Sequence, residues 1–442
     1  MKIQIPCGHD RFELEVPDSQ VAGVRSPRTL QPAADAGALA RTKIAAAIDR
    51  CGIADKAGPG ARACIAVTDR TRSTPLRLIV PILLEELNAL GVPDGRITII
   101  SGGGMHAADT REDLLQTLGP EVVGRVRLAT NEPDNEGVMV TLGRSDKGTP
   151  VQVHRHFAEA DIKIGVINVN PCMLAGWSGG GKIVQPAIAS RTSIYHNHKH
   201  FVQALMELRC ASLMGIMPPE NPVRADIEQC AEISGIDLVV NTVLDQQRRL
   251  VDLFCGAVVD AQRSAVECMA PYVEVALPQA VDVLVAAVGE PALEVSLFQG
   301  GSRVCGGADR YLRPGGTLVM VNACEEGIYE GFEHEQYRQW MRQMPTPAEI
   351  GKLVEEGAMG GEKGCVLFTF SWLLHEMNCR IVVVTGGMTA AELAEVHLGH
   401  ASGVQEAVDA ALASYPAGAS IGIMPCAGLV LPTLPDRRLN EG

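Results

Sequence analysis

Apolar runs of strand length alternate with amphipathic runs of helix length along most of the chain. In the first half, the runs at 63–69, 96–104 and 160–170 predict strands, and those at 75–91 and 110–119 predict helices. Strands that alternate with helices in this way are typical of βαβ units and predict a mostly parallel sheet.

A second series of the same kind begins near residue 278. Its expected elements are strands over 280–291, 315–323 and 379–387 and a helix over 402–415, and the preceding segment 258–277 is expected to be a connecting helix. We therefore predict an α/β fold with two α/β domains, mostly parallel sheets and an active-site cleft between the domains. The expected division is a cofactor-binding domain at 1–275 and a smaller closing domain at 276–416, with the tail from about 417 to 442 packed back on the first domain.

Three of the expected strands end in loops rich in glycine and polar residues. These loops are "TDRTRSTP" at 68–75, "SGGGMH" at 101–106 and "NPCMLAGWSGGGK" at 170–182. In open parallel sheets, ligands bind beyond the carboxyl ends of the strands. Three such loops at one edge of a sheet predict one shared pocket.

Composition restricts the classes of partner. The chain has 442 residues, a formal net charge of -14 and only 4% aromatic residues. Such a charge argues against a nucleic acid or an anionic membrane as partner, and local arginines would have to hold an anionic substrate. The 13 cysteines have no metal or disulfide spacing, and no apolar run has the length of a membrane helix, so we expect a soluble, cytoplasmic protein with reduced thiols.

The first two loops carry groups suited to binding and to proton transfer. Arg70 and Arg72 precede a helix that begins near Pro75, which predicts either an anion site or a capped, solvated turn. His106 follows three glycines at a strand-to-helix turn. A histidine there is suited to acid–base catalysis, although it could equally cap the turn.

The third loop nearly matches a phosphate-binding P-loop. Gly176, Gly181 and Lys182 fall in place, but Ile183 stands where a Ser or Thr would hold magnesium. The backbone N–H groups from Ser178 to Gly181 could form a phosphate nest, with Lys182 as a phosphate ligand or nucleophile. A P-loop-like phosphotransferase is therefore one alternative.

A cluster of alternating histidines follows at His196, His198 and His200. Imidazole suits zinc, copper, iron and nickel. A metal site in which one of these histidines is a ligand and a cofactor supplies the others is easier to form than a site of three histidines. A basic, solvated turn is the alternative.

Several of these segments match one known family. The matching residues are Asp69, Thr71, Arg72 and Pro75 in D-x-T-R-x-x-P, Gly104 and His106 in G-x-H, Ala175 to Lys182 in A-G-[FYW]-S-G-G-x-K, Asn197 and His198 in an N-H pair, and Gln299 in "EVSLFQGG". Together they resemble the nickel-dependent lactate racemase family, and the resemblance runs over most of the chain. It implies an isomerase that moves a hydride from a 2-hydroxy acid to a nickel-pincer nucleotide and back.

The resemblance also implies roles for individual residues. Lys182 would attach the cofactor and His198 would bind its nickel. The residues implied to contact the cofactor are Asp69, Thr71, Ser178, Gly179 and Gly180. Arg72 would hold the substrate carboxylate, His106 would exchange the hydroxyl proton, and Gln299 would come from the closing domain. The implied partners are a small 2-hydroxy acid and the proteins that make the cofactor, with no nucleic acid and no membrane.

Two positions depart from the family pattern. Cys172 stands where racemases have a second histidine, and Ser302, followed by Arg303, stands where lactate racemases have a substrate-facing lysine. Cys172 could act as the second base if its thiolate is stabilised. We therefore expect a racemase or epimerase of a 2-hydroxy acid other than lactate, such as a sugar acid. A one-sided redox enzyme or a non-catalytic binder with the same cofactor is the alternative.

Overall fold

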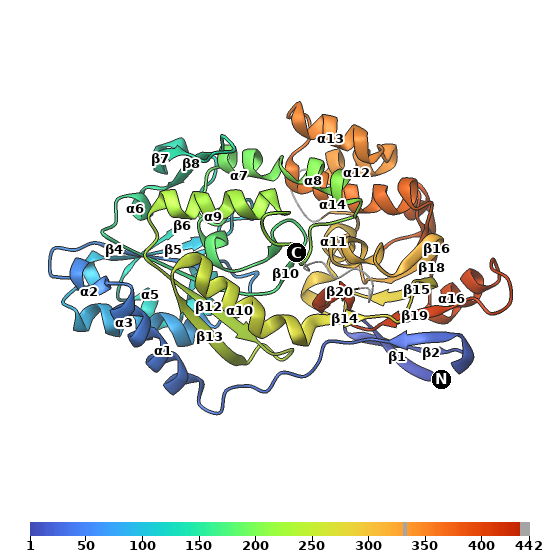
Figure 1. Cartoon of the computed structure of the whole chain (residues 1–442), viewed down its shortest axis with the longest axis horizontal. Coiled ribbons are helices and arrows are strands. Elements are labelled where there is room, and N and C mark those ends of the chain that lie inside the picture. The colour runs from blue at the N-terminus through green and yellow to red at the C-terminus, as the bar shows by residue number, and fades with distance from the viewer. Residues whose placement is uncertain (330–333, 434–442) are drawn as a thin grey trace.

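The structure is a computed structural model that describes residues 1–329 and 334–433. Two α/β units lie side by side along the longest axis of the molecule (Figure 1). The elements from α1 (Ala36–Arg50) to α10 (Val258–Val273), blue to yellow-green, form one unit. Those from α11 (Leu297–Ala308) to α16 (Val404–Leu412), yellow to red, form most of the other.

The strands of the first unit's sheet are β4 (Ala63–Thr68), β5 (Ile97–Gly102), β6 (Arg127–Thr130), β9 (Ile162–Asn168), β12 (Leu238–Leu244) and β13 (Leu250–Gly256). Among the described residues they form a six-stranded sheet in the order β13-β12-β9-β4-β5-β6. All neighbours pair in parallel except β13, which is antiparallel to β12 at one edge. The expected strands at 63–69, 96–104 and 160–170 are confirmed.

Both faces of this sheet are buried, which explains why its strands are apolar throughout. In β4, Ile65 and Val67 pack in one core and Cys64 and Ala66 in another, as the two-residue period of a strand requires. The remaining helices of this unit are α2 (Ile53–Lys56), α3 (Leu76–Ala89), α4 (Arg111–Leu118), α5 (Pro120–Val123), α6 (Arg155–Ala158), α7 (Arg191–His198), α8 (Phe201–Leu208) and α9 (Pro222–Ser234).

The second unit's sheet consists of β3 (Val21–Val24), β15 (Val281–Ala287), β16 (Leu312–Val321), β17 (Arg380–Val384), β18 (Gly399–Ala401) and β19 (Ile421–Met424). Within the described part of the chain, its order is β18-β17-β16-β15-β19-β3, and every neighbouring pair is parallel. The molecule is therefore an α/β protein with two mostly parallel sheets, as the alternating pattern predicts.

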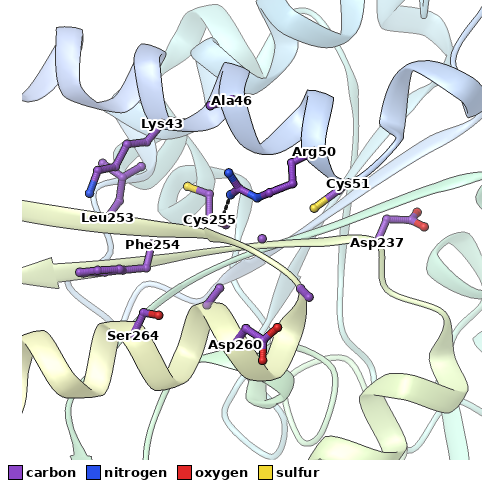
Figure 2. A pocket seen from close by; sticks show the side chains of 13 residues that line it. Lys43, Ala46, Arg50, Cys51, Asp237, Leu253, Phe254, Cys255, Asp260 and Ser264 are labelled. Atoms are coloured by element: carbon purple, nitrogen blue, oxygen red, sulfur yellow. Dashed lines mark hydrogen bonds between the residues drawn. The ribbon is translucent and has the colours of Figure 1, made fainter.

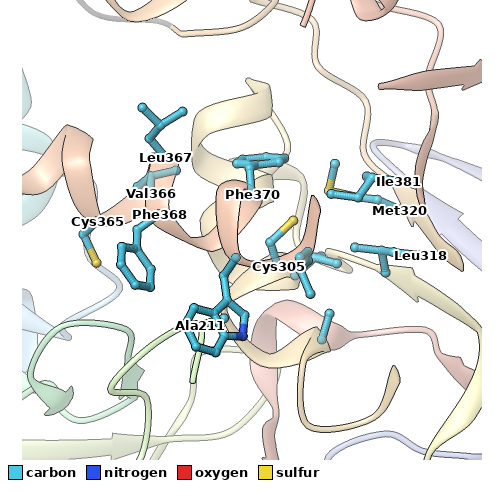
Figure 3. Close-up of a cluster of buried hydrophobic side chains, with 14 of the residues drawn as sticks. Ala211, Cys305, Leu318, Met320, Cys365, Val366, Leu367, Phe368, Phe370 and Ile381 are labelled. Atoms are coloured by element: carbon cyan, nitrogen blue, oxygen red, sulfur yellow. The ribbon is translucent and has the colours of Figure 1, made fainter. Parts of the chain in front are cut away.

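Two cores cover this second sheet. On one face, Leu318, Met320 and Ile381 pack with Phe368 and Phe370 of a buried helix (Figure 3). The opposite face packs against α16 and the N-terminal hairpin of β1 (Lys2–Cys7) and β2 (Asp10–Glu15). The other helices of this unit are α12 (His334–Gln343), α13 (Pro347–Glu355), α14 (Gly361–Ser371) and α15 (Ala390–Ala394).

Three further strand pairs complete the sheet structure of the described residues. They are β7 (Met139–Arg144) with β8 (Pro150–His154), β10 (Pro171–Cys172) with β11 (Gly176–Trp177), and β14 (Glu274–Ala276) with β20 (Leu431–Thr433). The β10–β11 hairpin lies within the third glycine-containing loop. It therefore fixes the position of Cys172 relative to the glycines that follow.

The strands are divided between the sheets differently from the expected split of the chain at residue 275. The segment 21–24, expected in the first domain, is the edge strand β3 of the second sheet. The tail also enters the second sheet, because β19 pairs with β15, and only β20 reaches back to β14 at the end of α10. Residues 434–442 of the expected tail lie outside the described residues.

All thirteen cysteines lie within the described residues, and they form no disulfide with one another. Among the helices of residues 1–329 and 334–433, none is both long and apolar enough to cross a bilayer.

Candidate active site

The topology of both sheets points to one place for a ligand. In the first sheet the strand order reverses between β4 and β9, and in the second between β15 and β19. Ligands bind at such switch points, outside the carboxyl ends of the strands. A cavity of about 300 Å³ is lined by the loops after β4, β5 and β9 of the first unit and by those after β15 and β19 of the second.

Most of the predicted site residues line this cavity. Those that do are Asp69, Thr71, Arg72, His106, Cys172, Ser178, Lys182, His198, Gln299 and Ser302. Residues as far apart in the sequence as Asp69 and Ser302 therefore meet in one site between the two units. The expected cleft is present, and it is enclosed by residues of both units.

His106 is held by a buried carboxylate. Its Nδ1 lies 2.7 Å from Oδ2 of Asp69, and the other carboxylate oxygen accepts a hydrogen bond of 2.8 Å from Thr71 Oγ1. Burial alone would raise the pKa of Asp69, but His106, Arg72 and Thr71 together lower it, so the carboxylate is ionised. With Nδ1–H directed at Asp69, Nε2 would be the nitrogen available for proton exchange.

This pair gives Asp69 a function that its sequence motif did not indicate. The motif placed Asp69 among the cofactor contacts, but both of its oxygens are engaged by His106 and Thr71. The two partners His106 and Asp69 are 37 positions apart and follow neighbouring strands β5 and β4. Only the sheet brings them together.

Cys172 is paired with a cation. Lys182 Nζ donates to Cys172 Sγ at 3.4 Å across the third loop. Burial acts to raise the thiol pKa, but Lys182, the backbone N–H groups of Ala175 and Leu174, and Arg303 outweigh it and lower the pKa to about 7. Near neutral pH the thiolate is therefore a major species, as proton exchange or nucleophilic attack requires.

The loop that carries this pair is fixed by α9. The Nη1 atom of Arg224 donates to the carbonyl oxygens of Trp177 and Gly179, at 3.3 and 3.2 Å. Asn221 Nδ2 donates to the carbonyl of Leu174 at 3.1 Å. Arg224 is fully buried and also pairs with a carboxylate of its own helix. Sequence patterns missed this arginine, because nothing local distinguishes it from an exposed one.

His198 has the properties of a metal ligand. It is buried at the end of α7, and its Nδ1 has no hydrogen-bond partner among the described residues. Burial, and then the charge of Lys182, lower its pKa to about 3, so the imidazole is neutral and can donate a lone pair. His196 and His200 do not line the cavity in the described structure, and His196 Nδ1 instead lies 3.1 Å from Thr149 Oγ1.

The glycine loop does not present its backbone to the cavity as expected. Gly179 and Gly180 do not line the cavity within the described structure, and the N–H of Gly180 donates to Asn241 Oδ1 at 2.8 Å. A Cβ at Gly179 would lie 2.6 Å from Val169 Cγ2, and one at Gly180 would lie 2.8 Å from Gln262 Cβ. These glycines allow close packing against β12 and α10, and their contact with a cofactor phosphate stays a prediction.

The loop also lacks the structural context that a P-loop requires. A P-loop opens an α-helix, whereas Gly180–Ile183 form one short 3-10 turn. Lys182 is directed at Cys172. Ser178 lines the cavity, but its hydroxyl donates to the carbonyl of Asn168 at 2.9 Å and accepts from the Asn170 N–H at 2.8 Å, which fixes the loop.

The two arginines of the first loop have different functions. Arg70 lies outside the cavity lining and pairs with the buried carboxylate of Asp109 at 3.0 Å, so it is not the anion ligand that the sequence allowed. Arg72 lines the cavity from the loop between β4 and α3. A second lining arginine, Arg303, comes from α11 and was noticed in the sequence only as the neighbour of Ser302.

The helix α11 brings the second unit's residues to the site. Gln299 and Ser302 both line the cavity from its first turns. The Ser302 hydroxyl donates to the carbonyl of Gln299 at 2.7 Å. Gly300 and Gly301 let the helix approach Asn322 and Phe370, which a Cβ at these positions would meet at 2.2 and 2.3 Å.

A second cavity lies on the outer side of the first unit, between α1, β13 and α10 (Figure 2). Its lining includes Lys43, Arg50, Cys51, Cys255 and Asp260, and Arg50 donates to the carbonyl of Cys255 at 2.7 Å. None of the predicted site residues lines it. The cavity between the two units is therefore the candidate active site.

The sequence of the chain matches known proteins over much of its length. A family model described as "Lactate racemase N-terminal domain" matches residues 7–207. The lactate racemase of Lactiplantibacillus plantarum is 28% identical over 271 residues, which are 61% of this chain and 62% of that protein, less than two thirds of its length. The lactate racemase of Thermoanaerobacterium thermosaccharolyticum is 22% identical over 360 residues, or 80% of this chain and 81% of that protein.

Solved structures share the fold. The lactate racemase apoprotein from Thermoanaerobacterium thermosaccharolyticum superimposes with a TM-score of 0.82 at 20% identity, over 98% of this chain and 100% of that one. A protein from Thermotoga maritima gives a TM-score of 0.67 at 19% identity, over 89% of this chain and 98% of that one. The likeness therefore includes both units.

The fold and cavity define a two-unit α/β protein in which a carboxylate-bound histidine and an ionisable thiol face one ligand site. The matched motifs and the similar sequences narrow this class of protein further. Its sequence is similar to lactate racemases, and residues 7–207 match the N-terminal domain of that family.

Proposed function

We propose that the protein racemises or epimerises a 2-hydroxy acid, with His106 and Cys172 as its two proton-exchanging groups. The observation that carries this proposal is that both groups line one cavity. His106 follows β5 and Cys172 follows β9, on opposite sides of β4, so they reach the cavity from two directions. A reaction that inverts a carbon atom needs a proton-exchanging group on each face of a flat intermediate.

The residues present fit the nickel-pincer nucleotide that the family resemblance implies. Alone, the described side chains form no group of three or more His, Cys, Asp or Glu that could hold a metal ion, so the cofactor would have to supply most of the ligands. The unpartnered, neutral imidazole of His198 would hold the nickel and the Lys182 amine would be the attachment point. When bound, this cofactor supplies an acceptor for the hydride of the α-carbon.

The protein's own groups would then orient the substrate and move its proton. Arg72 would bind the carboxylate through its guanidinium fork. His106 Nε2 would take the hydroxyl proton, and Asp69 would stabilise the imidazolium that forms. Cys172 would exchange the proton on the other face, with the backbone N–H groups of Ala175 and Leu174 and the charge of Arg303 favouring its thiolate once Lys182 carries the cofactor. Closure by both units around the cavity would exclude water.

The substrate we propose is a 2-hydroxy acid other than lactate. The supporting residues are Cys172, in place of a second histidine, and Ser302, whose hydroxyl is bonded to its own helix and which lacks the positive charge of a lysine. A site with a different charge pattern selects a different acid. Partner proteins that make the cofactor are part of this proposal.

The test is to co-express the protein with cofactor-making enzymes, measure its nickel and intact mass, and incubate it with single enantiomers of 2-hydroxy acids. We expect a nickel-containing adduct at Lys182 and the appearance of the second stereoisomer by chiral chromatography. Cys172→Ala should abolish racemisation and leave nickel content unchanged. Racemisation of lactate alone would reject the substrate proposal, and loaded protein inactive on every acid would reject the activity.

A further inference from the structure

Two arginines line the cavity whose guanidinium groups have no hydrogen-bond or ion-pair partner in residues 1–329 and 334–433. They are Arg72, in the loop before α3 in the first unit, and Arg303, on α11 in the second. A guanidinium carries five N–H donors that match a carboxylate as a fork. The cavity thus holds two guanidinium groups that have no anionic partner, although the chain as a whole has a net charge of -14.

The position of Arg303 is fixed by its helix. Gln299 and Arg303 are four residues apart on α11, so they project from the same face, and both line the cavity. Burial and the charge of Arg72 both lower the pKa of Arg303, whereas Cys172 and Glu290 raise it. Two positive groups from opposite units therefore act on each other across the site.

The acidic groups near Arg303 do not neutralise it. Cys172 is already paired with Lys182 at 3.4 Å. Glu290 is paired with Arg248, because Arg248 Nη2 donates to Glu290 Oε1 at 2.6 Å. Glu362 also lines the cavity but is not among the charges that act on Arg303. A substrate with one carboxylate would satisfy one guanidinium and leave the other desolvated and unpaired, which is costly.

We infer that Arg303 binds a second anionic group of the substrate, so that the substrates are 2-hydroxy acids with a second carboxylate. This inference rests on the proposed function. Arg72 would hold the carboxylate next to the reacting carbon, and Arg303 would hold the distal one beside Gln299. The two units would thus each bind one end of the same molecule, which couples substrate binding to closure of the cavity.

The test compares two acids of equal carbon number in the nickel-loaded enzyme, 2-hydroxybutanedioate and 2-hydroxybutanoate. We expect kcat/KM for racemisation to favour the dicarboxylate by roughly 100-fold, and Arg303→Met to remove most of that preference, so that the ratio of the two kcat/KM values falls toward one. Arg303→Gln serves if the Met variant does not fold. Arg41→Met, an exposed arginine on α1, is the matched control and should change neither rate.

A binding readout separates this inference from the proposed activity. Iodoacetamide should alkylate Cys172 more slowly in the presence of 2-hydroxybutanedioate than of 2-hydroxybutanoate, and this protection should disappear in Arg303→Met. Preferred turnover of the monocarboxylate, or equal protection by both acids, would overturn the inference and leave the racemase proposal intact. Loss of nickel and nucleotide from Arg303→Met would overturn it by assigning Arg303 to the cofactor.

Discussion

The ammonium group of Lys182 lies 3.4 Å from the sulfur of Cys172, and both side chains line the cavity between the two units. The two residues are ten positions apart and are brought together by the β10–β11 hairpin, in which Cys172 pairs with Gly176. The contact links a residue implied to bind the cofactor to one implied to move protons. Changes at Lys182 should therefore alter the chemistry of Cys172.

The first prediction concerns the thiol of Cys172 in protein without cofactor. Its alkylation rate by iodoacetamide should rise with pH through a midpoint of about 7, because the lowered pKa leaves much of the thiol ionised at neutrality. In Lys182→Met the largest opposing charge is lost, burial dominates, and the midpoint should move up by one to two units, which corresponds to a roughly 10- to 100-fold slower reaction at pH 7.

Mass spectrometry of digested protein measures this rate at each cysteine separately. Cys255, whose pKa is raised to about 12 by burial, is an internal control and should react slowly in both proteins. Lys163→Met, a partly buried lysine of the same sheet, should leave the Cys172 midpoint near 7. A midpoint that stays near 7 in Lys182→Met would show that the backbone and Arg303, and not Lys182, stabilise the thiolate.

The second prediction concerns the carboxylate behind His106. Asp69→Asn keeps the shape of the side chain but removes the charge that stabilises an imidazolium, and its amide can present N–H to the ring. We expect kcat of the loaded enzyme to fall roughly 100- to 10,000-fold, by analogy with the carboxylate of a catalytic triad. Asp94→Asn, at an exposed pair with Arg125, should have no such effect. Equal activity of both variants would remove Asp69 from the mechanism.

Three strands of each sheet could be predicted, because they depend on local periodicity. The expected strands at 63–69, 315–323 and 379–387 coincide with β4, β16 and β17. The sheet to which a short segment belongs is a different matter, because it is decided by contacts distant in the sequence. Thus β3 pairs with β19 almost four hundred residues later, and no pattern within 21–24 could indicate this partner.

In the site as well, some features could be predicted from local motifs and others depend on contacts between distant residues. Motif spacing located Asp69, His106, Cys172 and Lys182 correctly in one pocket, because strand ends of a parallel sheet meet at one edge. The spacing could not show that Asp69 binds His106 or that the N–H of Gly180 is used by Asn241. Those contacts depend on which side chain the folded chain brings within 3 Å, and that information is not local.

The third prediction tests how tightly the second loop is packed. A Cβ at Gly103 would lie 2.9 Å from Asp69 Oδ2 and 3.3 Å from His106 Cβ. Gly103→Ala should therefore displace the carboxylate–histidine pair and reduce kcat at least 10-fold, with little change in nickel content. Gly60→Ala is the matched control, because nothing lies within 4 Å of its added carbon. Full activity of Gly103→Ala would mean that the loop can shift without disturbing the pair.

The fourth prediction concerns the contact between the two units. The first residue of α14, Gly361, packs on His198, so that an added Cβ would lie 2.6 Å from His198 Cβ and 3.0 Å from its carbonyl oxygen. Gly361→Ala should force α14 away from α7 or move His198, at a cost of about 1–3 kcal/mol typical of overpacking. We expect a lower melting temperature and reduced nickel binding, measured by calorimetry and metal analysis.

The control for this variant is Gly386→Ala, where nothing lies within 4 Å of the added carbon, and it should change neither the melting temperature nor nickel binding. Normal nickel binding in Gly361→Ala would show that His198 keeps its position without this contact.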